Sequence, residues 1–92
     1  IIIGDNVRLG ANTIITDTDW HSDDYRVGLP EEVIIEDNVW IGVNTVVLKG
    51  VTIGKGTLVG ANSLVTKSLP ENVIAAGIPA RVIKYINGKK NE

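Results

Sequence analysis

The chain of 92 residues is long enough for one domain, and a domain of this size buries only about two-thirds of the surface that its unfolded chain exposes. It has no cysteine, which excludes disulfides, thiolate zinc sites and a cysteine nucleophile. No segment approaches the roughly 20 apolar residues that span a bilayer, so we expect a cytoplasmic protein that does not enter a membrane.

The net charge of -2 is unevenly distributed. Residues 1–48 carry nine acidic and two basic residues, whereas residues 49–92 carry seven basic and two acidic residues. The basic half could hold an anion. It is modest, lacks interleaved aromatic residues and belongs to a chain with a pI of about 5.3, so we do not expect nucleic acid as a partner.

A six-residue repeat runs through the chain with one interruption. A period of six fits neither an amphipathic helix nor an alternating strand, and it predicts short strands joined by corners. Glycine follows five of the nine repeat positions, and we expect it there because it adopts the backbone angles of a tight corner. The nine large aliphatic positions are Ile3, Leu9, Ile15, Ile35, Ile41, Val47, Ile53, Val59 and Val65.

Smaller residues lie four positions after most of these large ones. Two inward side chains per hexad fit a narrow interior if one is large and the other small. Three hexads make a triangular coil, whose neighbours pair as parallel strands about 4.8 Å apart. The small set is Val7, Thr13, Val39, Thr45, Val51, Thr57 and Ser63, and the expected stacks are Ile35 over Ile53, Ile41 over Val59 and Val47 over Val65.

The first coil would leave an unpaired strand edge and an uncapped core. The chain also begins with Ile1 and contains no methionine. We therefore expect further coils upstream of this sequence.

Four segments together resemble the hexapeptide-repeat acetyltransferases, in particular the carboxyl-terminal part of the galactoside and maltose O-acetyltransferase branch. The resemblance covers essentially the whole chain in the family's order, with a departure at Asn62, where the family usually has glycine. The segments are Val39–Gly42, Gly50–Gly54, Val59–Lys67 and Ala76–Lys84.

This resemblance implies an all-β fold, a left-handed parallel β-helix over residues 1–80 followed by a short C-terminal element and tail over residues 81–92. The hand comes from the resemblance, since parallel connections are otherwise right-handed. It also implies acetyl transfer from acetyl-CoA to a hydroxyl, usually of a sugar, in clefts between the subunits of a homotrimer.

Fourteen residues, 21–34, interrupt the repeat and predict a loop excursion from one corner. The excursion starts with His21, the only histidine. An imidazole with an ordinary pKa of about 6.5 can accept a hydroxyl proton near neutral pH. The resemblance places the family's catalytic histidine here, so we expect His21 to be the general base.

Two carboxylates, Asp17 and Asp19, precede this histidine and could orient the imidazole or a sugar hydroxyl, or could be solvated corner charges. One histidine offers poor ligand density, so we expect no metal.

The coenzyme residues come mainly from the resemblance. Trp40 precedes a repeat position and should face outwards, where it would border the acetyl-pantetheine end, although subunit packing could also explain it. Ala61 would let the pantetheine arm lie close to the backbone. The positions assigned to the adenosine and phosphate end are Thr66, Lys67, Arg81 and Lys84, whose lysines could equally be solubilising surface charges.

Two other functions stay open. A non-catalytic β-helix could serve as a structural or trimerisation module. An amine acceptor would make the protein an N-acetyltransferase acting on an amino sugar.

Overall fold

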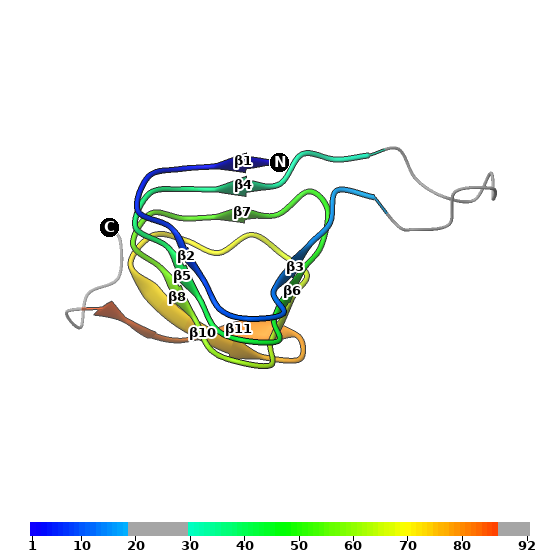
Figure 1. Cartoon of the computed structure of the whole chain (residues 1–92). Coiled ribbons are helices and arrows are strands. Elements are labelled where there is room, and N and C mark those ends of the chain that lie inside the picture. Colours follow the sequence, from blue (N-terminus) through cyan, green and yellow to red (C-terminus); the bar gives the residue numbers. More distant parts are fainter. Residues whose placement is uncertain (19–29, 87–92) are drawn as a thin grey trace.

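The computed structural model describes residues 1–18 and 30–86 (Figure 1). Nine strands of two residues each form the successive sides of triangular coils, and two longer strands follow them. The short strands are β1 (Ile2–Ile3), β2 (Arg8–Leu9), β3 (Ile14–Ile15), β4 (Ile34–Ile35), β5 (Trp40–Ile41), β6 (Val46–Val47), β7 (Thr52–Ile53), β8 (Leu58–Val59) and β9 (Leu64–Val65). The longer ones are β10 (Val73–Gly77) and β11 (Ala80–Tyr85).

Three sheets make the three sides of the prism. Strands β1, β4 and β7 form one sheet, β3, β6 and β9 a second, and β2, β5, β8, β10 and β11 the third. All pairs except β10 with β11 are parallel. The three predicted stacks are confirmed by the pairs Ile35↔Ile53, Ile41↔Val59 and Val47↔Val65.

The core has the predicted two inward side chains per hexad. Ile35, Ile41 and Ile53 are fully buried as the large members. Thr45 and Thr57 are fully buried as small members, and their hydroxyls donate hydrogen bonds to the carbonyls of Gly60 (3.2 Å) and Pro70 (2.6 Å). These two buried hydroxyls are thus paired with carbonyls of the following coil.

The expected reason for glycine after the repeat position is wrong. Gly4, Gly10, Gly42, Gly54 and Gly60 are not among the residues with positive φ. A Cβ on Gly42 would instead lie 2.6 Å from the Ala61 nitrogen, so glycine is needed because the next coil passes close by. The left-handed corner positions are filled by Asn6, Asn12, Asn38, Asn44, Asn62 and Asn72, with φ between 55° and 61°, and by Gly50 and Gly56.

The last coil is only partly regular. Leu69 forms a bridge to Ile53, and β10 then lies parallel to β8 before the chain reverses into β11, which begins at Ala80. On the other side of the interruption, Val33 is fully buried and Ile34 lies in β4, so the coil resumes within the range 21–34 that the sequence analysis gave to the excursion.

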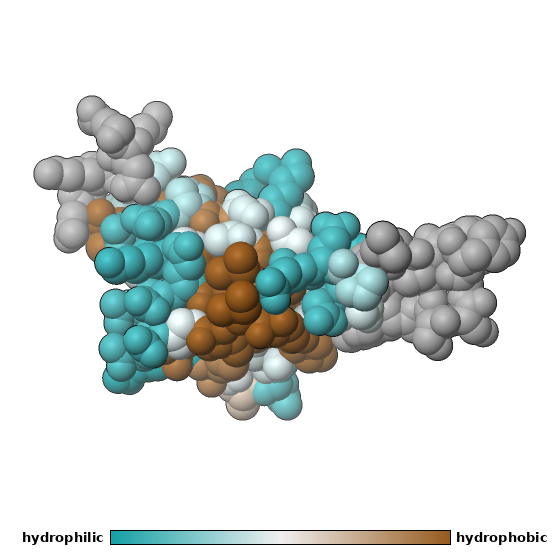
Figure 2. All heavy atoms as spheres, turned by 90° about the horizontal axis from the view of Figure 1, so that it is seen from above, coloured by the Kyte–Doolittle hydropathy of each residue, from teal (hydrophilic) through white to brown (hydrophobic). Residues whose placement is uncertain are grey.

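The first coil is the least covered. Its strands β1, β2 and β3 stand at the edges of their sheets, and the inward residues Ile3 and Leu9 are each 45% exposed. Figure 2 shows the apolar area on this side, bordered by hydrophilic residues. Within residues 1–18 and 30–86, no helix has the length and apolar character needed to cross a membrane.

Candidate functional site

The excursion leaves and rejoins the coils at one corner, which we call the Asp17 corner (residues 16–18, 48–50 and 66–68). The Thr16 hydroxyl donates to the Thr18 carbonyl (2.8 Å), and the Thr18 amide donates back to that hydroxyl (3.3 Å). The Glu31 amide donates to the Asp17 carbonyl (3.0 Å), so the two ends of the excursion are bonded to each other. His21 and Asp19 lie outside the described residues.

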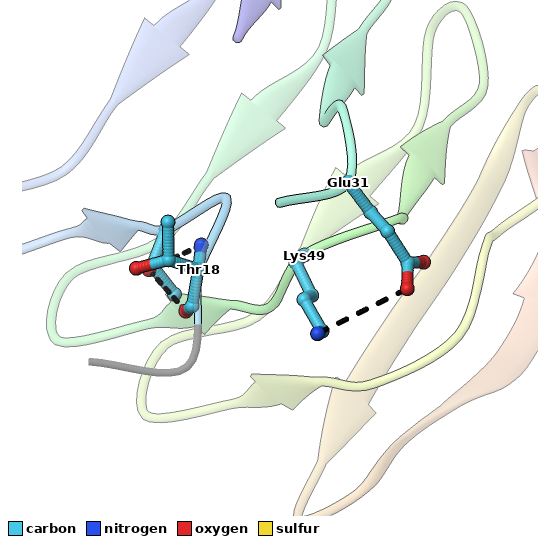
Figure 3. Close-up of polar contacts among 4 residues, drawn as sticks. Thr18, Glu31 and Lys49 are labelled. Carbon is cyan, nitrogen blue, oxygen red and sulfur yellow. Dashed lines mark hydrogen bonds and ion pairs between the residues drawn. The ribbon is translucent and has the colours of Figure 1, made fainter. Parts of the chain in front are cut away.

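The rejoining end is also tied to the next coil. The Gly50 amide donates to the Glu31 carbonyl (3.2 Å), and the Lys49 ammonium lies 3.9 Å from the Glu31 carboxylate (Figure 3). Because Glu31 is well exposed, this ion pair contributes little stability. The backbone bonds fix the point from which the excursion starts.

Two of the predicted coenzyme residues, Thr66 and Lys67, also lie at this corner, one coil beyond Lys49. Both are exposed. The corner therefore combines the half-buried Asp17, the start of the His21 excursion and two cationic side chains.

Trp40 lies on a different side of the prism. Its side chain is 54% exposed, as expected for a residue that faces outwards, while its neighbour Ile41 is fully buried. In register with it are Arg8 on β2 and Leu58 on β8, and Leu58 is in turn in register with Ile74 on β10. We call this outward row, made of Arg8, Trp40, Leu58 and Ile74, the Trp40 face.

The hairpin extends this face with positive charge. Lys84 on β11 pairs with Ile74, and Arg81 pairs with Ala76, so both project on the outward side. Both are exposed. The Trp40 face thus runs from an indole over two aliphatic side chains to two cations.

Ala61 lies at the corner between the Trp40 face and the sheet formed by β3, β6 and β9. Within the described residues, neither its amide nor its carbonyl forms a hydrogen bond, whereas the carbonyl of Val43, one coil earlier, accepts from the Asn62 amide (2.9 Å). Ala61 is exposed, so this backbone can bond to an amide-bearing ligand.

One chain does not bring all the predicted residues together. Trp40, Arg81 and Lys84 lie on the Trp40 face with Ala61 beside it, whereas Asp17, Thr66 and Lys67 lie at the Asp17 corner. Between them lies the outward side of the β3-β6-β9 sheet, which we call the aliphatic face because its outward residues are Ile14, Val46 and Leu64.

Sequence reasoning missed Arg8. Its pairing with Trp40 was readable, since their separation of 32 residues equals one 18-residue coil plus the 14-residue excursion. In the part of the chain that the structure describes, no cluster of three or more histidine, cysteine, aspartate or glutamate residues could hold a metal ion.

Comparisons with known proteins identify the family to which this chain belongs. Residues 32–67 match the family of bacterial transferase hexapeptide (six repeats), and residues 1–17 match the hexapeptide repeat of succinyl-transferase. The chain belongs to the hexapeptide-repeat transferases, and its fold is the left-handed parallel β-helix that the resemblance implied.

Within this family the chain is similar to galactoside acetyltransferases. It is 46% identical over 91 residues to the galactoside O-acetyltransferase of Lactococcus lactis, a match that covers 95% of this chain and 44% of the relative. A galactoside acetyltransferase solved in complex with coenzyme A superposes with a TM-score of 0.84 at 42% identity, covering 92% of this chain and 44% of that one.

A hexapeptide-repeat acetyltransferase of Vibrio cholerae, solved with acetyl coenzyme A, gives a TM-score of 0.82 at 39% identity, covering 91% of this chain and 48% of that one. The chain therefore spans about half the length of the curated and solved relatives that it matches.

Proposed function

We propose that this protein is an acetyl-CoA-dependent O-acetyltransferase that acts on a sugar or a similar hydroxyl acceptor. The observation that carries the proposal is the Trp40 face in a chain of this family. This face is a continuous outward row that runs from the Trp40 indole to the cations Arg81 and Lys84. A cytoplasmic location is part of the proposal.

The residues of this face fit the coenzyme. Trp40 would border the thioester, Leu58 and Ile74 would lie under the apolar part of the pantetheine arm, and the free backbone of Ala61 would bond to its amides. Arg81 and Lys84 stand at the far end, where the diphosphate and 3′-phosphate need cations. The coenzyme supplies the activated acetyl group.

The separation of the two groups of residues supports a homotrimer. Ile14 on the aliphatic face is 42% exposed, and beside this face Val43 and Ile78 are 42% and 74% exposed, which is an apolar surface suited to a partner. In a closed ring of three copies, contacts are head to tail, so one edge of the aliphatic face meets the other edge on the neighbour. The Ala61 edge and Trp40 face of one subunit would then meet the Asp17 corner of the next.

In this cleft His21 of the excursion is the proposed general base. Its imidazole accepts the proton of the acceptor hydroxyl while the oxygen bonds to the thioester carbonyl carbon. The carbon–sulfur bond then breaks, and the imidazolium returns the proton to the departing thiolate. Asp17 and Asp19 are proposed to orient the imidazole or the acceptor. Thr66 and Lys67 are proposed to contact the nucleotide end of the coenzyme from the neighbouring subunit.

The test replaces His21 with alanine. Turnover with acetyl-CoA and a set of sugars should fall by about 100-fold or more, because general-base catalysis contributes about 100- to 10,000-fold. The dissociation constant of acetyl-CoA, measured by calorimetry, should stay within about twofold. Near-normal turnover in this variant would remove His21 from the mechanism.

The same measurements separate the alternatives. A folded trimer that fails to bind acetyl-CoA would favour the structural module. An acceptor screen that yields product only with amino sugars would make the reaction an N-acetylation.

A further inference from the structure

Arg8 and Trp40 are direct neighbours on the outward surface. They are register partners on the parallel strands β2 and β5, as Leu9 and Ile41 are on the inward side. Adjacent strands lie about 4.8 Å apart, so the guanidinium can reach any molecule that contacts the indole. Both side chains are exposed.

The Arg8 guanidinium has no structural partner among the described residues. Within residues 1–18 and 30–86, Arg8 forms no ion pair and no side-chain hydrogen bond. The Asp37 carboxylate, on the corner before β5, accepts a hydrogen bond from the Asp5 amide (2.8 Å). Arg8 therefore offers a full set of donors on the surface.

The order of residues along the Trp40 face indicates which molecule Arg8 would contact. The row begins at Lys84, passes Ile74, Leu58 and Trp40, and continues to Arg8. If the coenzyme phosphates lie at the Lys84 end and the thioester lies at Trp40, then Arg8 is the next position beyond the acetyl group. The molecule that lies there is the acceptor.

We infer that Arg8 determines acceptor specificity by binding an anionic group, a carboxylate or a phosphate, on the hydroxyl-bearing substrate. A guanidinium presents donors in a planar fork that matches two oxygens of such a group, and these charge-assisted bonds are strong. The inference rests on the proposed function, because that function locates the thioester. It narrows the acceptor from any sugar to a sugar acid or a sugar phosphate.

An alternative use of Arg8 is to stack on Trp40 and hold the indole. That role would affect the coenzyme rather than the charge of the acceptor. The two roles therefore differ in which ligand senses a substitution.

The test compares three acceptors that share one ring, namely a neutral hexose, the matching uronic acid and the matching hexose phosphate. The unsubstituted protein should acetylate one of the anionic acceptors at least about tenfold more efficiently than the neutral one. In Arg8→Leu, kcat/KM for that acceptor should fall about 10- to 100-fold, mainly through KM, as expected for lost hydrogen bonds to a charged group. The neutral hexose should change by less than about twofold.

Two further variants refine the test. Arg8→Lys should recover part of the loss, because it keeps the charge but not the fork. Lys55→Ala removes an exposed cation at the corner between β7 and β8, on the side of the Trp40 face away from Ala61, and should leave all three acceptors unchanged. Equal losses for neutral and anionic acceptors, or weaker acetyl-CoA binding in Arg8→Leu, would overturn the inference in favour of the stacking role.

Acceptor binding, measured by calorimetry in the presence of coenzyme A, separates this inference from the proposed reaction. Arg8-dependent binding of an anionic acceptor without acetylation would uphold the inference and overturn the reaction. Acetylation that is indifferent to acceptor charge and to Arg8 would uphold the reaction and overturn the inference.

Discussion

Gly42 and Ala61 are stacked so closely that a Cβ carbon on Gly42 would stand 2.6 Å from the Ala61 backbone nitrogen. The two next nearest atoms, the Cα of Ala61 (2.8 Å) and the carbonyl carbon of Gly60 (3.0 Å), also belong to the backbone, so no flexible side chain could move aside to relieve the contact. The distance between successive coils at this corner therefore depends on the absence of a side chain.

Gly42→Ala should destabilise the protein by about 1–3 kcal/mol, the usual cost of forcing an extra methyl group into a packed interior. Urea denaturation followed by circular dichroism measures this cost. The matched control is Gly60→Ala, where the nearest atom would be the Ala76 side-chain Cβ at 3.0 Å, and its cost should be smaller. An equal or larger loss at Gly60 would contradict the close-approach explanation.

The asparagines of the corners give a second stability prediction. Asn62 has φ of 59°, in the left-handed region that β-branched residues avoid. Asn62→Val should cost about 1–2 kcal/mol, whereas Asn62→Gly should stay within about 1 kcal/mol, because glycine adopts this angle freely but loses more entropy on folding. Thermal unfolding of both variants checks the difference, and a tolerated valine would show that the corner relaxes.

A third prediction concerns a buried hydroxyl. Thr57 donates to the Pro70 carbonyl (2.6 Å) and accepts from the Val73 amide (3.3 Å), which ties the last coil to the one before. Thr57→Val keeps the shape but leaves both backbone groups unpaired, so it should cost about 1–3 kcal/mol. Thr57→Ser keeps the hydroxyl and loses one methyl group. If the serine variant were the less stable one, packing rather than hydrogen bonding would dominate here.

The repeat was predictable because its period leaves a strong mark on the sequence. Large aliphatic residues such as Ile35 and Ile53 must point inwards, and their spacing sets the coil length and the register. The role of Gly42 was not predictable from the residues around it in the sequence, since the backbone that crowds it belongs to the next coil of the chain. A tight corner needs a residue with a left-handed φ, but only the structure shows that Asn62 is the residue that adopts this angle.

The sequence named candidate site residues one by one but did not give their arrangement. Family motifs pointed to Trp40 and Lys67 individually, without showing that these two lie on different sides of the prism. Their sides follow from which of the three sheets each strand joins. Arg8 escaped notice because its relation to Trp40 appears only after the excursion is removed from the count.

Trp40 gives the fourth prediction. Because the indole is 54% exposed, Trp40→Ala should change the free energy of unfolding by less than about 1 kcal/mol. It should weaken acetyl-CoA binding by about 5- to 50-fold if the ring covers the acetyl-pantetheine end, and Trp40→Phe should retain part of the affinity. Binding calorimetry at matched concentrations of folded protein measures the acetyl-CoA affinity of both variants. Unchanged affinity with a dissociated trimer would assign the indole to subunit packing instead.

The last prediction separates the two ends of the Trp40 face. Arg81 and Lys84 lie on β11, opposite Ala76 and Ile74, and are proposed to meet the coenzyme phosphates. Arg81→Ala should weaken binding of acetyl-CoA about 10-fold or more, as loss of a charge-assisted pair would, while leaving acetyl-pantetheine, which has no phosphate, within about twofold. The effect on acetyl-CoA should shrink at high salt because screening weakens exposed ion pairs. The same losses for both ligands would mean that Arg81 shapes the hairpin rather than binding phosphate. Lys84→Ala, tested alongside it, should show the same pattern with a smaller loss, because an ammonium lacks the guanidinium fork.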